Sequence, residues 1–99
     1  MKSTSPGPLS QKEKKALRGV AQRLKPTLQI GKNGVTESLV DELDQALSKD
    51  ELVKARFPKD RDAMTEQIET LATRSNSHCV ARVGFSATFY RPKQTNTNN

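Results

Sequence analysis

The chain has 99 residues, with three phenylalanines, one tyrosine and no tryptophan, so it has room for one small domain with an aliphatic core. Its formal charge is +6, and its single cysteine, Cys79, excludes an internal disulfide. No apolar run has the length of a secretion signal or a membrane span, so we expect a reducing, cytoplasmic setting and no membrane partner.

The positive charge is concentrated at the start of the chain. Residues 1–34 have a net charge of +7 and contain one acid, Glu13, whereas residues 35–99 have a net charge of −1. Such an uneven distribution is typical of proteins that bind a polyanion. The basic side chains of the first part are Lys2, Lys12, Lys14, Lys15, Arg18, Arg23, Lys25 and Lys32.

Residues 1–8 are small and polar and include two prolines, so we expect a flexible arm. Ser10 and Glu13 have the spacing of a capping box, which predicts the start of a helix. This helix should end near Lys25, because the following Pro26 disfavours a helical residue before it. Its apolar stripe has helical spacing and consists of Leu17, Val20, Ala21 and Leu24.

Basic side chains form a second stripe on this helix. Lys14, Arg18 and Gln22 are four residues apart, and Lys25 should lie one further turn along. Charged stripes are usually solvated faces, but this one leads toward a glycine turn and contains no acid, which favours contact with phosphates. The predicted basic track consists of Lys12, Lys14, Lys15, Arg18 and Lys25.

A turn framed by two glycines is the main candidate for function. Thr27–Ile30 has the pattern of a short strand, and Gly31 and Gly34 follow it with G-x-x-G spacing. Glycine lets a ligand approach the backbone closely and tolerates dihedral angles that are closed to other residues. Thr36 can cap the next helix, so the free N–H groups of the turn and the positive helix end would both face a bound anion.

Two polar residues lie between these glycines. Lys32 would add a mobile point charge for a phosphate. Asn33 is either a reader of base edges or a residue that tolerates left-handed backbone geometry, and we favour the second interpretation. The turn is therefore predicted to bind the phosphate backbone of a polyanion.

The segment after Thr36 is predicted to be an amphipathic helix with acidic outer faces. Its apolar stripe consists of Leu39, Leu43, Ala46 and Leu47, and its carboxylates are Glu37, Asp41, Glu42 and Asp44. Paired carboxylates can act as general acid and base, but these lie on an exposed helix with no histidine or metal-binding partner nearby in the sequence. We therefore interpret them as non-catalytic.

The remaining segments are predicted to be one strand, one helix and a pair of strands. Residues 51–57 alternate between apolar and polar, which predicts a half-buried strand. Asp60 or Asp62 should begin a third helix. Two β-strand runs, 78–83 and 85–90, meet at Gly84 in either a two-residue hairpin turn or a bulge. Residues 93–99 form a polar tail.

No set of residues predicts catalysis or metal binding. Cys79 lies in an apolar run and is interpreted as a small core residue. Its neighbour His78 should point to the opposite face of the strand, so the geometry is poor for a metal site or a catalytic dyad made of the two. We therefore expect no enzyme activity, no metal and no cofactor.

The order of elements and several sequence blocks resemble a known family. The run from Leu24 to Thr36 closely resembles the CRM domain, the chloroplast RNA splicing and ribosome maturation module, in its stand-alone bacterial YhbY form. The resemblance covers residues 9–92. It includes the further blocks Leu17-Arg18-Gly19, Glu51-Leu52-Val53-Lys54, Asp60-Arg61, Gly84 and Tyr90-Arg91-Pro92.

This resemblance implies a single α/β domain with a four-stranded mixed sheet, similar to the C-terminal domain of translation initiation factor three. It also implies RNA binding through the G-x-x-G turn and neighbouring basic residues. The RNA would be rRNA of the large ribosomal subunit precursor, as bacterial members look like factors that associate with such precursors, and we favour a monomer.

Two alternatives stay open. The chain departs from the family at Phe85, where members commonly carry a polar or basic residue. This side chain is either core or a platform on which a base stacks, and we favour core because it alternates with Ala87 and Phe89. The protein could also be an adaptor in which the acidic face of the second helix docks a ribosomal protein and RNA contact is incidental.

Overall fold

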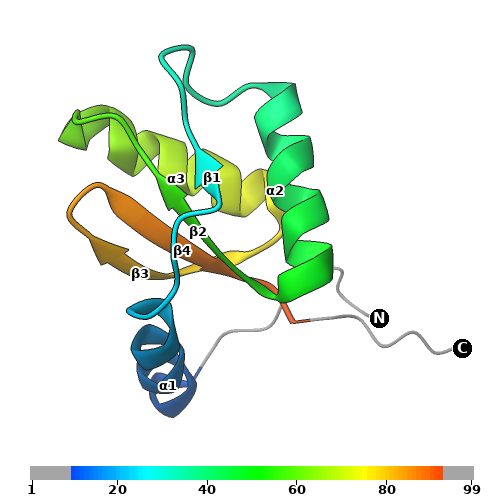
Figure 1. The fold of residues 1–99 in the computed structure, drawn as a ribbon, viewed down its shortest axis with the longest axis vertical. Helices are drawn as coiled ribbons and strands as arrows, with labels where there is room; N and C mark the ends of the chain where they lie inside the picture. Colours follow the sequence, from blue (N-terminus) through cyan, green and yellow to red (C-terminus); the bar gives the residue numbers. More distant parts are fainter. Residues whose placement is uncertain (1–9, 93–99) are drawn as a thin grey trace, which may run out of the picture.

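The computed structural model describes residues 10–92, in which three helices and four strands follow the predicted order (Figure 1). The predicted arm and tail lie outside these residues. The elements are α1 (Gln11–Ala21), β1 (Leu28–Gln29), α2 (Glu37–Asp50), β2 (Leu52–Arg56), α3 (Arg61–Ser75), β3 (His78–Val83) and β4 (Ser86–Tyr90).

The strands form one mixed sheet in the order β1-β2-β4-β3. The β1 strand pairs in parallel with β2, with Leu28 opposite Ala55, whereas β4 is antiparallel to both β2 and β3. Because β1 and β2 are parallel, both strands end at the same edge of the sheet, and α2 forms the crossover connection between them. The α/β class and the four-stranded mixed sheet predicted from the sequence are confirmed.

One face of the sheet carries the main core. Val53, Ala55 and Phe57 point to this face, as the alternation of β2 predicts, and all three are buried. They pack with the apolar sides of α2 and α3 in one continuous cluster. The buried residues that the helices add are Leu39, Val40, Leu43, Leu47, Met64, Ile68 and Leu71. The capping residues Ser10, Thr36 and Asp60 begin the three helices.

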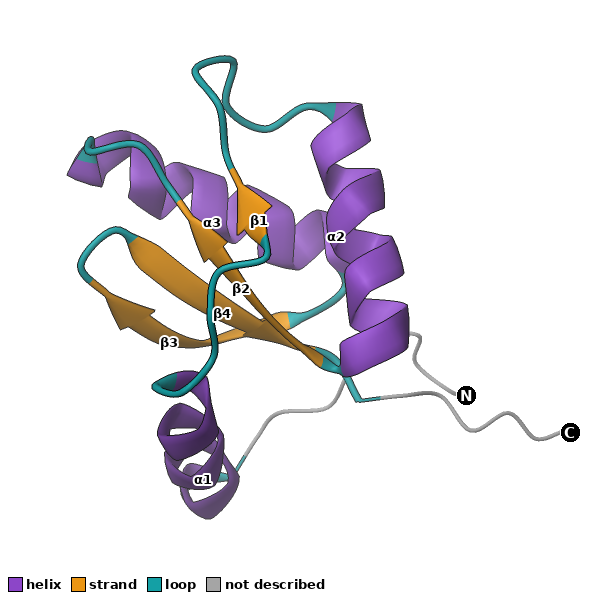
Figure 2. Cartoon of the chain, in the orientation of Figure 1, coloured by secondary structure: helices purple, strands orange, loops and turns teal. Residues whose placement is uncertain are grey.

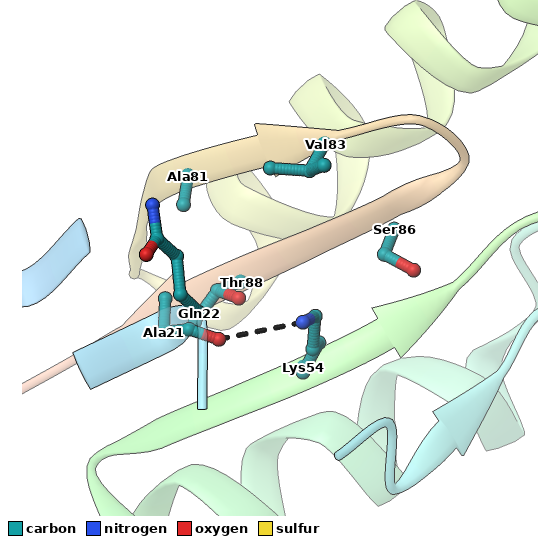
Figure 3. Close-up of a pocket in the computed structure, with 7 residues that line it drawn as sticks. All are labelled: Ala21, Gln22, Lys54, Ala81, Val83, Ser86 and Thr88. Carbon is teal, nitrogen blue, oxygen red and sulfur yellow. Dashed lines mark hydrogen bonds between the residues drawn. The ribbon is translucent and has the colours of Figure 1, made fainter. Parts of the chain in front are cut away.

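Of the three described helices, α1 is the one that packs on the opposite face, beside β3 (Figure 2). Within α1 only Ala21 is buried, and Val20, predicted to belong to the apolar stripe, is 48% exposed. The helix ends at Ala21 and not near Lys25, so the predicted end is wrong. The Lys54 ammonium group donates a hydrogen bond of 3.3 Å to the carbonyl oxygen of Ala21 (Figure 3). It donates a second bond of 3.2 Å to the carbonyl oxygen of Leu24, so a side chain of the sheet caps the end of this helix.

The last two strands form a hairpin with Gly84 and Phe85 as its turn. Gly84 has φ of 59°, which suits the first central residue of a primed turn. The sheet's irregularity lies earlier, between Cys79 and Ala81. Val80 is buried there, while Cys79 is exposed on the edge strand, so the prediction of a core cysteine is wrong. The prediction relied on the apolar run around Cys79 and on the usual burial of free cysteine, whereas the edge position of β3 and the local pairing shift leave this residue exposed.

The end of β4 is tied to two helices by Arg91. Its guanidinium donates to the Asp44 carboxylate at 2.6 Å and to the Asp44 carbonyl oxygen at 2.9 Å. It also donates to the hydroxyl of Ser48 at 2.9 Å and to the carbonyl oxygen of Ser75 at 2.8 Å. One planar side chain thus joins the final strand to the last turns of α2 and α3.

Candidate nucleic-acid interface

The glycine turn closes on itself at the end of β1. The Gly34 N–H donates to the Gly31 carbonyl oxygen at 3.0 Å, which leaves Lys32 and Asn33 as the exposed central residues. Gly34 has φ of 71°, a conformation that other residues adopt only with strain. Asn33 does not have positive φ, so a tolerance for left-handed geometry does not explain its presence.

The two glycines have different structural roles. A Cβ atom at Gly34 would lie 3.2 Å from the Gln67 side-chain nitrogen, and its φ is positive, so the fold itself requires glycine there. A Cβ atom at Gly31 would meet nothing within 4 Å, and the φ of this residue lies outside the left-handed region. Nothing in residues 10–92 therefore requires glycine at position 31.

The turn rests on buried groups. Ile30, just before it, is 2% exposed, and Val35, just after it, packs partly buried against the core. The side chain of Gln67 reaches the turn from α3, and its Oε1 atom is buried without a hydrogen-bond partner among the described residues. Ile30 and Val35 thus attach both ends of the turn to the core, and the Gln67 side chain lies against Gly34. The backbone of the turn is therefore held in place before any ligand binds.

A shallow depression lies between the turn and the start of α2. The hydroxyl of Thr36 accepts a hydrogen bond of 3.2 Å from the Leu39 N–H and caps this helix as predicted. The helix start gives the depression a positive partial charge, whereas Glu42 adds a negative one. Its lining residues are Gln29, Gly31, Lys32, Asn33, Gly34, Thr36, Ser38, Leu39 and Glu42.

The predicted basic track is divided in space. In Figure 1, whose vertical direction is the longest axis of the protein, the turn lies at the top and α1 at the bottom. Lys25 lies beyond the end of α1, in the extended segment that joins them, so it does not continue the helical stripe. Six residues of extended chain span about 20 Å. The structure therefore leaves Lys12, Lys14, Lys15 and Arg18 away from Lys32.

Arg56 is a basic residue near the turn that the sequence reasoning did not select. It is exposed at the end of β2, pairs in register with Gln29, and its carbonyl oxygen accepts from the Ile30 N–H at 2.9 Å. Together with residues 26–29 it lines an open groove along β1. The alternation of β2 places Arg56 on an exposed side, but only the parallel pairing places it between Lys25 and the turn.

The pKa values of Cys79 and Tyr90 are displaced from their ordinary values. Although Cys79 is exposed as a residue, the protein atoms around its thiol partly desolvate it and raise its pKa, against the opposing effects of the Ala81 backbone and the Arg82 charge. Partial burial, followed by the charges of Glu51 and Glu13, raises the pKa of Tyr90.

Residues 10–92 contain no cluster of side chains suited to a metal ion. Within that range no helix has the length and apolar character needed to cross a membrane.

Comparison with known proteins identifies the family. The sequence model of the CRS1 / YhbY (CRM) domain matches residues 9–91. The chain belongs to the CRM domain family. One relative of this CRM protein is "Probable RNA-binding protein PA4753" of Pseudomonas aeruginosa, with 34% identity over 84% of this chain and 81% of the relative. Another is an "RNA-binding protein" of Haemophilus influenzae, with 32% identity over 87% of this chain and 88% of the relative.

The fold of the CRM protein also matches a solved structure. The solution structure of hypothetical protein SAV1595 from Staphylococcus aureus, described as an RNA-binding candidate, superimposes with a TM-score of 0.78 at 32% identity. The match covers 90% of this chain and 94% of that one. A more distant relative, "Probable RNA-binding protein YqeI" of Bacillus subtilis, shares 29% identity over 89% of this chain and 93% of its own length.

Proposed function

We propose that this CRM protein binds RNA by its phosphate backbone at the Gly31–Gly34 turn. The observation that carries the proposal is Gly31, which is exposed and is glycine although neither its φ nor any neighbouring atom requires it. A ligand that approaches the backbone closely accounts for the missing side chain. The start of α2 and the ammonium group of Lys32 supply positive charge beside it.

Basic residues extend this contact along the edge of the sheet. Arg56 and Lys25 lie on the way from the turn toward α1, and Lys12, Lys14, Lys15 and Arg18 follow on the helix. Contacts of this kind read the shape and charge of RNA and carry little sequence information. An RNA that uses the whole path is at least as long as the extended segment between α1 and the turn.

The RNA that we propose is rRNA of the large ribosomal subunit precursor, bound by a monomeric, cytoplasmic protein. The names of the bacterial relatives support RNA as the partner class. The proposed role is that of a binding factor without enzyme activity, which is supported by the lack of a side-chain cluster suited to a catalytic metal ion among residues 10–92. A nuclease assay with and without added Mg²⁺ should show no turnover.

The primary test is a salt titration of RNA affinity with Lys32→Ala. Loss of one phosphate contact should lower the slope of log K against log salt by about 1 and leave the melting temperature nearly unchanged. Lys49→Ala is the matched control, since Lys49 is also exposed but lies in the last turn of α2. An unchanged slope for Lys32→Ala would remove this residue from the interface.

The identity of the RNA is tested by crosslinking in cells followed by sequencing of the bound RNA. Large-subunit rRNA and its precursors should be enriched over other transcripts. Enrichment of mRNA instead would contradict the proposed ribosomal role while leaving RNA binding itself intact.

Fewer carboxylates of α2 are available to bind a partner protein, as the adaptor function requires, than the sequence suggests. Asp44 accepts from Arg91, and Glu37 lies 3.9 Å from Arg74, so two of the four carboxylates have partners within the chain. Asp41 and Glu42 are exposed and have no ion pair among the described residues. If the Asp41→Asn, Glu42→Gln double variant loses ribosome association but keeps or raises its affinity for naked RNA, the adaptor function is favoured, because neutralising Glu42 removes a negative charge from the depression beside the turn.

A further inference from the structure

The edge of the sheet that carries the glycine turn also carries the hairpin tip. The β1 and β2 strands are parallel, and β4 is antiparallel to β2, so the start of β4 lies at the edge where β1 and β2 end. Only β2 separates β1 from β4, and neighbouring strands lie about 4.8 Å apart. The base of the glycine turn and the hairpin tip are therefore about 10 Å apart across the sheet.

An arginine lies over an aromatic ring at this tip. The Cζ atom of Arg61, the first residue of α3, is 5.8 Å from the ring centroid of Phe85. Phe85 is half-buried and packs against the core, and its carbonyl oxygen accepts from the Phe57 N–H at 2.7 Å. The ring is thus held on one side by the core, while Arg61 is exposed on the other.

The residues around this pair favour a neutral ligand group over a phosphate. Asp60 and Asp62 flank Arg61 in the sequence, and the Asp60 carboxylate already accepts from the Ala63 N–H at 3.1 Å, which caps the helix. These carboxylates repel an anion at the start of α3. A nucleobase is uncharged and planar, and it can stack on a guanidinium plane or an aromatic face.

Other basic side chains provide positive charge on either side of the pair. Arg82 is exposed on β3, and its Nη1 atom donates to the hydroxyl of Thr65 on α3 at 3.0 Å. Arg56 and Lys59 are exposed at the end of β2 and in the loop that follows. Phosphates next to a stacked base would meet these side chains, while the base itself would meet Arg61.

We propose that the Arg61–Phe85 pair is a stacking platform for one unpaired nucleobase of the same RNA whose backbone lies at the glycine turn. This inference rests on the proposed function and adds that the protein prefers RNA with an accessible single-stranded base. It also resolves the two roles considered for Phe85: the ring is anchored in the core on one side and supports the platform on the other.

The test compares two synthetic RNAs: a hairpin with a single-stranded loop that contains 2-aminopurine, and a fully paired duplex of the same length. Arg61→Lys keeps the charge but removes the planar guanidinium. We expect it to weaken loop binding about tenfold, in the range of one base–aromatic stack, and to leave duplex binding and the salt slope unchanged. Wild-type protein should quench the 2-aminopurine fluorescence, and Arg61→Lys should not.

Two further variants complete the experiment. Phe85→Leu keeps an apolar side chain in the core but removes the ring, and it should reproduce the loss of loop preference. Arg74→Lys is the matched control, because Arg74 is exposed in the last turn of α3 and should affect neither RNA. Arg61→Lys changes no core residue, so the test holds even where Phe85→Leu lowers stability.

Each outcome bears on the platform. If Arg61→Lys binds both RNAs as wild type does, or weakens both equally, the stacking platform is overturned. If these results occur while Lys32→Ala still reduces the salt slope, the platform fails and the proposed function stands. Wild-type protein that binds neither RNA would overturn both.

Discussion

The glycine turn and α1 carry most of the positive charge predicted to bind RNA, but they are attached to the protein in opposite ways. The turn is flanked by Ile30 and Val35, which belong to or pack against the main core, and Gln67 supports it from below. Within Gln11–Ala21, α1 buries Ala21 alone and is fixed at its end by Lys54. Charge density along the sequence therefore does not indicate how rigidly that charge is held.

This difference suggests two kinds of contact with RNA. A backbone held by the core presents its N–H groups without a further loss of conformational entropy, which favours a defined geometry. Long basic side chains on a lightly attached helix can instead adapt to phosphates at varying positions. The comparison predicts effects on stability that decrease from the turn to the attachment of α1, and effects on RNA affinity that decrease from Gly31 to the charges of α1.

The largest effect is expected for Gly34→Ala. A side chain here must adopt φ of 71° and lie 3.2 Å from Gln67, so unfolding free energy should fall by roughly 1–3 kcal/mol. Thermal unfolding measures this loss as a drop of several degrees in melting temperature. A melting temperature equal to that of wild type would contradict the view that the fold fixes the turn.

Lys54→Met should have a smaller and local effect. It keeps the apolar stem but removes the ammonium group from the carbonyl oxygens at the end of α1, at a cost of about 1 kcal/mol. Amide hydrogen exchange should accelerate in α1 and stay unchanged in α2 and α3. Lys59→Met, in an exposed loop, is the control. Equal acceleration in all three helices would show that α1 is not a separate unit.

Gly31→Ala should change affinity with little change in stability. Its added methyl group meets no atom of the protein within 4 Å, so the free energy of unfolding should change by no more than about 0.5 kcal/mol, as is typical of surface substitutions. If RNA approaches the backbone here, affinity should fall by about tenfold, the loss expected for one charge-assisted hydrogen bond. RNA titration with folded protein measures the change, and wild-type affinity would place the RNA elsewhere.

The smallest effects are expected for single charges on α1. Lys14→Ala and Lys15→Ala should each lower the salt slope by no more than about 1 and weaken binding equally for RNAs of different sequence. Neither residue has an ion pair among the described residues, so stability should change little. Gel-shift titrations at several salt concentrations measure both quantities. If neither variant lowers the slope, α1 makes no phosphate contact.

Features that depend on nearby residues could be predicted from the sequence. The capping box of Ser10 and Glu13 and the cap at Thr36 involve residues three apart, and both form as predicted. The alternation along β2 correctly places Val53 and Ala55 in the core. Each of these patterns involves residues only a few positions apart, so the order of helices and strands could be predicted from them. The family resemblance then added the arrangement of the strands in the sheet.

Features that depend on residues far apart in the sequence could not be predicted. The end of α1 is set by Lys54, which lies 33 positions from Ala21. Cys79 is exposed because of a pairing irregularity on an edge strand, and neither property has a local signal. For the candidate site, the glycine turn was visible in the sequence, whereas Arg56 and the Arg61–Phe85 pair required the strand order.

The bonds of Arg91 have a consequence for how the protein folds. They join residues 47, 43 and 16 positions apart, so they can form only after most of the chain has been brought together. Contacts with such sequence separation incur a large loop-closure entropy and are typically absent from the folding nucleus. We therefore expect the Arg91 guanidinium to act mainly on unfolding: its bonds should slow the unfolding rate and contribute little to the folding rate.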